Sequence, residues 1–323
     1  MNKLDQFIIP ETENNSRLDR CIRRNLGYIN QSLLEKSLRN KLILLNGKKA
    51  KASDKIEKKQ IILYEKSLFS SNKKNELVLS KAKINYYLDL YKKIKIKENK
   101  NLVVLNKPNK IAVQGGTRQN LYIDELLKVV SNEDKLKLVH RLDKDTSGIL
   151  LIAKNLKTTQ SLNYSFKNNE VQKLYLAIVS PVPNKLEGYI TSKIEKNKFV
   201  QSRKMKISDT NGKYAKTYFK TLVKNLNFAL VCLYPITGRT HQLRVHMNQI
   251  NCSIVGDKKY SLNDSYKEED NFLKLHSYMI KIPNVIQIKA PLPEHFINFI
   301  NEKNLNFELK IIEKDFVKDF NYE

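Results

Sequence analysis

Residues 140–154 read HRLDKDTSGILLIAK, a charged loop that runs directly into an apolar segment. The apolar run 149–153 predicts a fully buried strand, because both of its faces are apolar. Thr146, Ser147 and Gly148 favour a turn before that strand, since glycine takes positive φ at no steric cost. A rigid strand with a charged loop at its end is a common position for catalytic groups, although a solvated turn has the same composition.

The net charge of the chain is large and positive. Of 323 residues, 59 are Lys or Arg and 33 are Asp or Glu, which gives a formal charge of +26 and a pI near 9.7. The abundance of Lys, Asn and Ile indicates a compositional bias that also adds Lys to inert surfaces. The excess over acids still favours a polyanionic partner, expected to be nucleic acid, with an anionic membrane surface as the alternative.

The cysteines and the apolar runs bear on the cellular compartment. Cys21, Cys232 and Cys252 are scattered, which predicts neither a disulfide framework nor a zinc site and fits a reducing environment. The N-terminal residues lack a signal-peptide stretch, and no run approaches the ~18 apolar residues that a membrane helix requires. We therefore expect a soluble cytoplasmic protein.

The length allows roughly two domains. Changes in composition along the chain predict a flexible leader, a small basic module, a Lys- and Ser-rich linker and a large second domain, at 1–15, 16–70, 71–95 and 96–323 respectively. In the basic module, the pattern SLLE at 32–35 predicts a capping box for a helix. Asn46-Gly47 favours a tight hairpin turn.

The large domain alternates strand and helix patterns. Strands are expected at 102–105, 172–179, 213–223 and 228–234, helices at 121–130, 158–168 and 294–300, and a long polar excursion at 184–210. Leu243, Met247 and Ile250 at helical spacing favour a helix that begins near Thr240. His241, Arg244 and Asn248 would then share a second face of that helix.

Several chemistries could use the residues of the charged loop. A triad of His140, Asp143 and Ser147 lacks a nucleophile-elbow motif. Asp143 and Asp145 are too close in sequence to flank a sugar from opposite sides, and the histidines have no metal-ligand spacing. What remains is Asp143 beside arginines, which should keep it ionised. Such a carboxylate can attack an electrophilic carbon or remove a proton.

The motifs identify the chain as similar to the RluA family of pseudouridine synthases. The resemblance covers nearly all of the chain after residue 15 and rests on HRLDKDTSG (140–148), LNKP (105–108), KLY (173–175), GKYAKT (212–217), TGRTHQLRVH (237–246), GD (256–257) and LH (275–276). The basic module resembles an S4 RNA-binding module through RLD (17–19), its Leu-rich second helix and LLNGK (44–48). An S4 module before the catalytic domain is the arrangement of the family members that act on large-subunit rRNA.

The resemblance implies an α+β fold with a mixed, mostly antiparallel sheet, and an isomerase that needs no cofactor and no metal. It implies that Asp143 drives detachment of uracil and its reattachment through carbon 5. Tyr175 would pack against the target base, and Arg244 would pair with Asp143. The substrate-binding set would be Arg141, Arg239 and His241, with Arg141 helping to hold or replace the uridine that is flipped out of its RNA helix.

The module ahead of the catalytic domain would contact RNA phosphates. The residues expected to do so are Arg17, Arg20, Arg24, Lys36, Arg39, Lys48 and Lys49. The chain departs from the family pattern at three positions. Lys41 stands where a helix-ending Gly is usual, Asn109-Lys110 replaces a small residue and Gly, and Gln114 replaces a His. Asn tolerates the left-handed conformation, so we expect the turn after Pro108 to form.

The expected function is therefore isomerisation of uridines in large-subunit rRNA by a monomer that requires no protein partner and no membrane. A non-catalytic rRNA-binding assembly factor is the alternative from another class. A pure binding protein would need none of Asp143, Tyr175 and Arg244 together. Transferase or hydrolase chemistry on small nucleotides is disfavoured by the charge of +26. The target uridines, and whether Asp143 acts as nucleophile or base, stay open.

Overall fold

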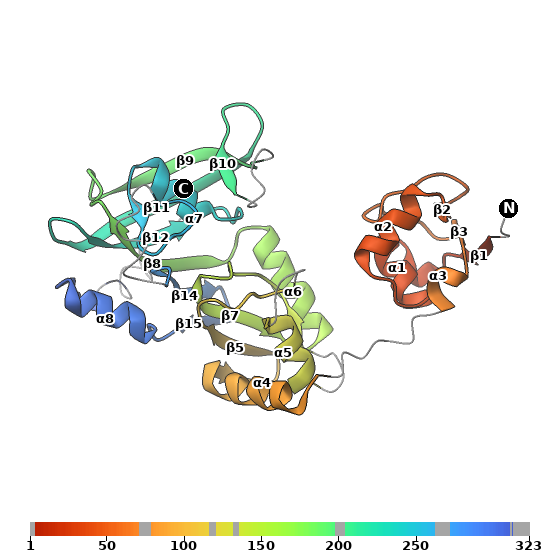
Figure 1. The fold of residues 1–323 in the computed structure, drawn as a ribbon, viewed down its shortest axis with the longest axis horizontal. Helices are drawn as coiled ribbons and strands as arrows, with labels where there is room; N and C mark the ends of the chain where they lie inside the picture. The colour runs from red at the N-terminus through yellow and green to blue at the C-terminus, as the bar shows by residue number, and fades with distance from the viewer. Residues whose placement is uncertain are drawn as a thin grey trace. The chain divides into compact units, whose positions relative to one another are not determined.

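The computed structural model describes residues 4–70, 79–115, 121–131, 136–197, 204–261, 272–310 and 312. The chain divides into two compact units, 1–80 and 81–323. Figure 1 shows each unit with its own sheet and helices.

The first unit is a three-stranded antiparallel sheet with short helices. The strand order is β1-β3-β2. Its elements are β1 (Asp5–Ile8), the 3-10 helix η1 (Glu11–Glu13), α1 (Leu18–Asn25), α2 (Gln31–Arg39), β2 (Ile43–Leu45), β3 (Ile61–Tyr64) and α3 (Ser67–Ser70). The apolar positions of α1 and α2 form one core with the sheet, which includes the fully buried Leu18, Ile22, Leu34 and Ile62.

The prediction of a flexible leader is wrong over residues 5–13. Residues 5–8 form β1, which pairs with β3, and residues 11–13 form η1. Ile9 is buried in the core of the unit, and the buried Glu13 bonds to Arg24. The composition of this segment is polar, but two or three apolar side chains are enough to attach it to the unit.

Local details of the first unit also differ from the sequence pattern. Helix α2 is capped by Asn30, whose side chain accepts from Leu33 N at 2.8 Å, so the capping box predicted at 32–35 is wrong. Asn46 and Gly47 have φ of 48° and 72°, as the predicted hairpin turn requires. Lys41, which replaces the usual Gly, takes φ of 61° after the end of α2.

The second unit is built on one large sheet. Among the described residues its strand path is β10-β9-β11-β12-β8-β14-β7-β5-β4, with β13, β15 and β6 attached to its side. The elements are α4 (Lys81–Ile94), β4 (Lys95–Glu98), β5 (Leu102–Lys107), α5 (Ile123–Val130), β6 (Lys137–Leu138), β7 (Ser147–Ala153), α6 (Leu156–Lys167), β8 (Gln172–Ser180), β9 (Glu187–Lys196), β10 (Met205–Ile207), β11 (Lys213–Lys224), β12 (Ala229–Pro235), α7 (Gln242–Gln249), β13 (Ser253–Ile254), β14 (Leu275–Ile282), β15 (Ile286–Lys289) and α8 (Glu294–Glu302).

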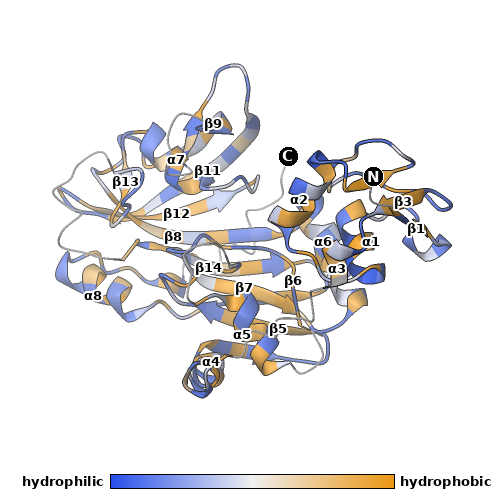
Figure 2. Cartoon of the chain, turned by 45° about the vertical axis from the view of Figure 1, so that its right-hand side comes forward, coloured by the Kyte–Doolittle hydropathy of each residue, from blue (hydrophilic) through white to orange (hydrophobic). Residues whose placement is uncertain are grey.

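The sheet is mixed and mostly antiparallel, which confirms the predicted fold class for this unit. Its pairings are antiparallel except that of β14 with β7. Strand β8 carries apolar residues on both faces. Leu174, Leu176 and Ile178 pack on the side of α8, whereas Ala177 and Val179 pack on the side of α7. Figure 2 shows apolar colouring along β5 and β7, with mixed colouring on the helices around them.

The expected linker is wrong over residues 81–94, which form α4 and pack against α5. Tyr87 is fully buried, and its hydroxyl donates to Glu125 at 2.5 Å. Lys83 pairs with the same carboxylate at 2.7 Å. The Lys-rich composition concealed one buried aromatic and one buried ion-pair partner. Residues 71–78 of the expected linker lie outside the described residues.

The polar excursion predicted at 184–210 is largely regular structure. Strands β9 and β10 pair antiparallel, with Lys196 opposite Met205, and residues 198–203 between them lie outside the described residues. Ile190 and Ile194 are buried at alternating positions of β9. The alternation was difficult to recognise because Lys, Glu and Ser occupy most of the other positions.

Two strands approach unusually closely where the charged loop enters the sheet. Gly148 has φ of 108°, and a Cβ there would lie 2.3 Å from the backbone oxygen of Ser277 in β14. Only glycine is compatible with this contact. The sequence predicted glycine's role here from the positive φ of a turn and not from the close approach of β14. The chain therefore needs glycine at this position for two independent reasons, and the start of β7 is rigidly placed.

Candidate active site

A pocket of about 460 Å³ lies where three parts of the second unit meet. The loop before β7, the start of β8 and the segment leading into α7 line it. All six residues predicted to act on the substrate line this pocket, namely Asp143, Tyr175, Arg244, Arg141, Arg239 and His241. These residues come from distant parts of the sequence, and the fold brings them together.

The charged loop is held from beneath by a buried lysine. Lys107, at the end of β5, is fully buried and its Nζ donates to the carbonyl oxygens of Pro108, Ile111 and Lys144 at 2.8, 2.8 and 3.0 Å. Burial lowers the pKa of Lys107 to about 7, against the opposing charges of Asp145 and Asp143. The three carbonyl acceptors match the three N–H donors of a lysine ammonium group, so this side chain ties β5 to the loop.

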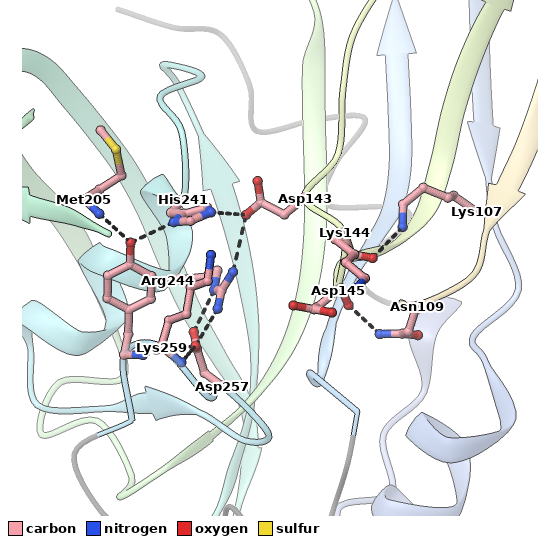
Figure 3. Close-up of polar contacts among 11 residues, drawn as sticks. Lys107, Asn109, Asp143, Lys144, Asp145, Met205, His241, Arg244, Asp257 and Lys259 are labelled. Atoms are coloured by element: carbon pink, nitrogen blue, oxygen red, sulfur yellow. Dashed lines mark hydrogen bonds and ion pairs between the residues drawn. The ribbon is translucent and has the colours of Figure 1, made fainter. Parts of the chain in front are cut away.

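Asn109 gives the loop a second attachment. Its side-chain amide donates to the backbone oxygens of Asp145 at 2.5 Å and Leu273 at 3.2 Å, as Figure 3 shows for the first contact. The turn at 109–110 forms as expected, and the residue in the left-handed conformation is Lys110, with φ of 65°. Asn109 is therefore retained in the turn for its amide, which reaches the loop.

Asp143 faces an arginine that is itself held by a second carboxylate. Arg244 Nη1 lies 3.7 Å from Asp143 Oδ2, and its Nε and Nη2 donate to Asp257 at 2.7 and 2.5 Å (Figure 3). The side chains of Arg244 and Asp257 are 3% and 1% exposed, whereas Asp143 is 28% exposed to the pocket. Burial opposes the charged guanidinium, but the bonds to Asp257 and the charge of Asp143 raise the pKa of Arg244.

Asp257 therefore orients Arg244 and leaves one edge of the guanidinium for Asp143. Sequence reasoning named residues 256–257 as a motif but gave Asp257 no role. Gly256 before it has φ of 77°, and a Cβ there would meet the backbone oxygen of Phe272 at 2.2 Å. The Gly-Asp motif at 256–257 was the signal in the sequence that could have identified Asp257 as the buried partner of Arg244.

His241 lies on the other side of Asp143. Its Nε2 is 3.8 Å from Asp143 Oδ2, and its Nδ1 is 2.7 Å from the hydroxyl of Tyr260. His241 precedes α7 and has φ of 55°, an uncommon conformation for a residue other than glycine. Burial lowers the pKa of His241, and the positive charges of Arg244 and Lys259 lower it further. The negative charges of Asp143 and Asp257 act in the opposite direction and do not outweigh them. Tyr260 was not identified from the sequence.

Helix α7 begins one or two residues after the predicted position and shows the expected faces. His241, Arg244 and Asn248 all contact Tyr260, while Leu243 and Met247 pack on the sheet. The remaining polar residues of the TGRTHQLRVH segment attach the helix to the sheet. Gln242 bonds to Thr237, Arg239 N, Lys216 O and Thr217, and His246 bonds to Thr217 and Ser192.

Tyr175 lies on β8 and forms part of the pocket wall. Burial and the nearby charge of Asp143 raise the pKa of its hydroxyl to about 12. Lys173, two residues earlier on the same face of the strand, also lines the pocket, and burial lowers the pKa of its amine to about 8. The alternation expected for this strand therefore brings an aromatic ring and an amine to the same wall.

The other predicted substrate contacts lie at the rim of the pocket. Arg141 is exposed and its Nη1 donates to Gln114 at 3.3 Å, so the residue that replaces the family's His contacts this arginine. Gly116, from the same segment, lies outside the described residues. Arg239 is exposed, and its Nε donates to the backbone oxygen of Tyr214 at 2.8 Å. Both guanidinium groups keep free edges toward solvent.

The basic residues of the first unit fall into two groups. Arg17 pairs with Asp19 at 2.7 Å, and Arg24 pairs with Glu13, so both have structural partners. Arg17 also precedes α1 instead of lying on its outer face with Arg20 and Arg24. The remaining residues are exposed and have no ion pair among the described residues, namely Arg20, Lys36, Arg39, Lys48 and Lys49.

Among the residues that the structure describes, no cluster of three or more His, Cys, Asp or Glu is arranged to hold a metal ion. Within the same ranges, no helix combines the length and the apolar character that crossing a membrane would require.

Enzymes of known RNA-modifying families share the sequence and the fold of this chain. The RNA pseudouridylate synthase family model matches residues 101–249. Ribosomal large subunit pseudouridine synthase C of Rickettsia bellii is 39% identical over 290 residues, which are 87% of this chain and 96% of that protein. Ribosomal large subunit pseudouridine synthase D of Borreliella burgdorferi is 37% identical over 242 residues, 70% of this chain and 74% of that protein.

Solved structures support the same assignment. Human RNA Pseudouridylate Synthase Domain Containing 4 superimposes with a TM-score of 0.59 at 28% identity, over 70% of this chain and 98% of that one. Human RNA Pseudouridylate Synthase Domain Containing 1 shares the fold, with a TM-score of 0.60 at 23% identity, over 71% of this chain and 96% of that one. The chain belongs to the RluA family of pseudouridine synthases and is an isomerase of uridine in RNA.

Proposed function

We propose that this enzyme isomerises uridines of large-subunit ribosomal RNA, with Asp143 as the catalytic carboxylate. The observation that carries the proposal is the Asp143–Arg244 pair at 3.7 Å in the wall of a pocket in a strongly basic chain. The relatives that this chain matches over most of their length are named ribosomal large subunit pseudouridine synthases. These names support large-subunit ribosomal RNA as the class of substrate.

The chemistry needs a base that has left its RNA helix. In the reaction the bond from N1 of uracil to C1′ breaks, a bond from C5 to C1′ forms, and the proton of C5 is released while N1 gains one. A stacked base cannot reach a pocket, so it must be flipped out. Tyr175 is positioned to stack on the flipped base, a contact worth ~1–3 kcal/mol, and Arg141 at the rim is available to the flipped nucleotide or to the gap it leaves.

The first unit is proposed to act as the S4-like module that holds the RNA. Five of its exposed basic residues, Arg20, Lys36, Arg39, Lys48 and Lys49, lie on two helices and one hairpin turn. Contacts of this kind go to phosphates and fix the position of an RNA without reading its sequence. We propose domain bounds near 5–70 and 81–323, because Ile9 already packs in the core of the first unit.

Pseudouridine mapping on unmodified large-subunit rRNA tests the proposal. We expect new pseudouridines with the wild-type enzyme and a loss of about 10²–10⁴-fold in rate with Asp143→Asn, because the variant keeps shape and loses the reactive carboxylate. Asp145→Asn is the matched control. It removes the same charge from the same loop, but residue 145 does not line the pocket, so we expect it to remain active.

The outcomes separate the alternatives. If the wild-type protein bound this RNA tightly and left every uridine unchanged, the proposed substrate would be wrong and a role in ribosome assembly would be favoured. If Asp145→Asn abolished the reaction while Asp143→Asn did not, the assignment of the catalytic carboxylate would be overturned.

A further inference from the structure

Tyr260 connects the catalytic pocket to the β9–β10 hairpin through its hydroxyl. The hydroxyl oxygen accepts a hydrogen bond from the backbone N–H of Met205, the first residue of β10, at 2.8 Å. The same oxygen lies 2.7 Å from Nδ1 of His241. These contacts form a line from Met205 through Tyr260 and His241 to Asp143, and Figure 3 labels Met205, His241 and Asp143 along it.

The hydrogen bonds of the Tyr260 hydroxyl favour one tautomer of His241. The N–H of Met205 can only donate, so it uses one lone pair of the tyrosine oxygen. Among the described residues the acceptor within reach of the tyrosine proton is Nδ1 of His241, so every group is satisfied when Nδ1 accepts that proton. A neutral imidazole that accepts at Nδ1 carries its own proton on Nε2. That nitrogen is the one 3.8 Å from Asp143 Oδ2.

The surroundings of His241 favour the neutral ring. Asp143 and Asp257 are the acidic groups near it, and Arg244 and Lys259 are the basic ones. Burial of the ring adds to the effect of the two cations, and together they lower the pKa of His241. Burial raises the pKa of Tyr260, so its hydroxyl keeps its proton.

The tyrosine is held firmly by the same groups that organise Arg244. Its backbone N–H and that of Lys259 donate to Asp257 Oδ1 at 3.1 and 2.9 Å, the carboxylate that also binds Arg244. Its carbonyl accepts from Asn248 at 2.6 Å. The ring lies 5.2 Å from the guanidinium carbon of Arg244. One short segment therefore orients both neighbours of Asp143.

We propose that Tyr260 is a positioning residue that locks His241 in the tautomer with the proton on Nε2, so that His241 presents a donor to Asp143 opposite Arg244. A distance of 3.8 Å is longer than a hydrogen bond, but catalytic contacts of this kind often shorten only when substrate is bound. The left-handed backbone at His241, with φ of 55°, fits a residue retained for the place of its ring. The inference rests on Asp143 being the catalytic group of the proposed function.

Tyr260→Phe tests the lock, because it removes only the hydroxyl and keeps the ring beside Arg244. We expect kcat on rRNA to fall about tenfold with KM unchanged, since one positioned donor is misaligned and no RNA contact is lost. Tyr164→Phe is the matched control, because that side chain is 63% exposed on α6, outside the pocket. An unchanged kcat for Tyr260→Phe would overturn the proposal.

A double-mutant cycle distinguishes positioning from a general structural role. His241→Asn removes the Nε2 donor and suits a left-handed backbone. If Tyr260 acts through His241, the double variant Tyr260→Phe/His241→Asn has the kcat of His241→Asn alone. If the two losses multiply, Tyr260 acts by another route and the proposal fails.

Nitrogen NMR of the imidazoles gives a readout that does not depend on activity. The chain has five histidines, so ¹⁵N-histidine labelling yields few signals, and the pair lost in His241→Asn identifies residue 241. We expect a protonated Nε2 and an unprotonated Nδ1 in the wild type, and a mixture of tautomers in Tyr260→Phe. A protonated Nδ1 in the wild type would refute the lock. If Asp143→Asn were active, the proposed function would fail, while this spectrum would still decide the tautomer.

Discussion

At the scale of single residues, buried groups with complete hydrogen bonding hold the pocket in shape. His246 is fully buried, with Nδ1 2.9 Å from Thr217 Oγ1 and Nε2 3.1 Å from Ser192 Oγ. It attaches α7 to β11 and β9, next to the residues that face Asp143. Burial lowers its pKa to about 4. The ring is therefore neutral in the folded protein, and its titration is coupled to stability.

The pH dependence of unfolding follows from this shift. In the unfolded chain His246 becomes protonated below pH ~6.5, whereas in the folded protein it stays neutral until pH ~4. The unfolded state therefore binds more protons between these two pH values. Stability is complete above pH ~6.5 and falls by up to about 3 kcal/mol as the pH drops to 4. Urea unfolding of the wild type and His246→Gln at pH 7.5, 6 and 5 should show a smaller acid loss in the variant. Parallel pH profiles would contradict this.

At the scale of elements, the crossing of the charged loop into the sheet depends on the parallel pair β7 and β14. His276 lies opposite Ser147 and Ser277 opposite Gly148, and Ser147 Oγ is 2.8 Å from His276 Nδ1. The two strands meet at the residue where the loop ends. The position of Asp143 is thus determined by a strand that comes more than a hundred residues later in the chain.

Gly148→Ala should disrupt this pair. The new Cβ would lie 2.3 Å from Ser277 O at a φ of 108°, so we expect a loss of about 3 kcal/mol or more in unfolding free energy, together with most of the activity. Gly188→Ala is a control in the same unit, because its φ is 157° but its nearest contact is Phe219 at 3.6 Å. Thermal unfolding monitored by circular dichroism compares them, and equal losses would show that steric overlap with β14 is not the cause.

At the scale of the whole molecule, binding and chemistry are assigned to different units. The pocket proposed for the chemistry is lined by residues of the second unit, whereas the first unit offers exposed cations. A charge of +26 attracts any polyanion, so overall charge explains affinity and not the choice of RNA. The two roles can therefore be changed independently.

Substituting Lys36 and Arg39 with Gln should weaken RNA binding without changing the chemical step. Each lost phosphate contact is expected to reduce the slope of log K against log salt by about 0.7–0.9, and kcat at saturating RNA should stay the same. Filter binding at several salt concentrations measures the slope. The matched control, Arg24→Gln, removes a cation paired with Glu13. It should lower the stability of the first unit and change the slope of log K against log salt little. An unchanged slope in the double variant would mean that this face does not meet RNA.

Much of this organisation was predictable from the sequence, because local patterns have local causes. The apolar run after the charged loop became β7, the spacing of Leu243 and Met247 became α7, and Asn46-Gly47 became a turn. The family motifs identified the chemistry and the six residues around the pocket. Where the composition was polar, as in 5–13, 81–94 and 187–196, the same reasoning missed regular elements whose stability comes from a few buried side chains.

The sequence by itself determined the strand and helix patterns, the excess of positive charge and the residue types available for chemistry. Only the tertiary structure decided which of those residues meet. Asp257 was a motif without a role, and Tyr260 had no local signal, yet both orient the partners of Asp143. The reason is physical: spacing along a chain encodes which face of an element a side chain occupies, whereas contacts between distant segments arise from packing of the whole sheet and its helices.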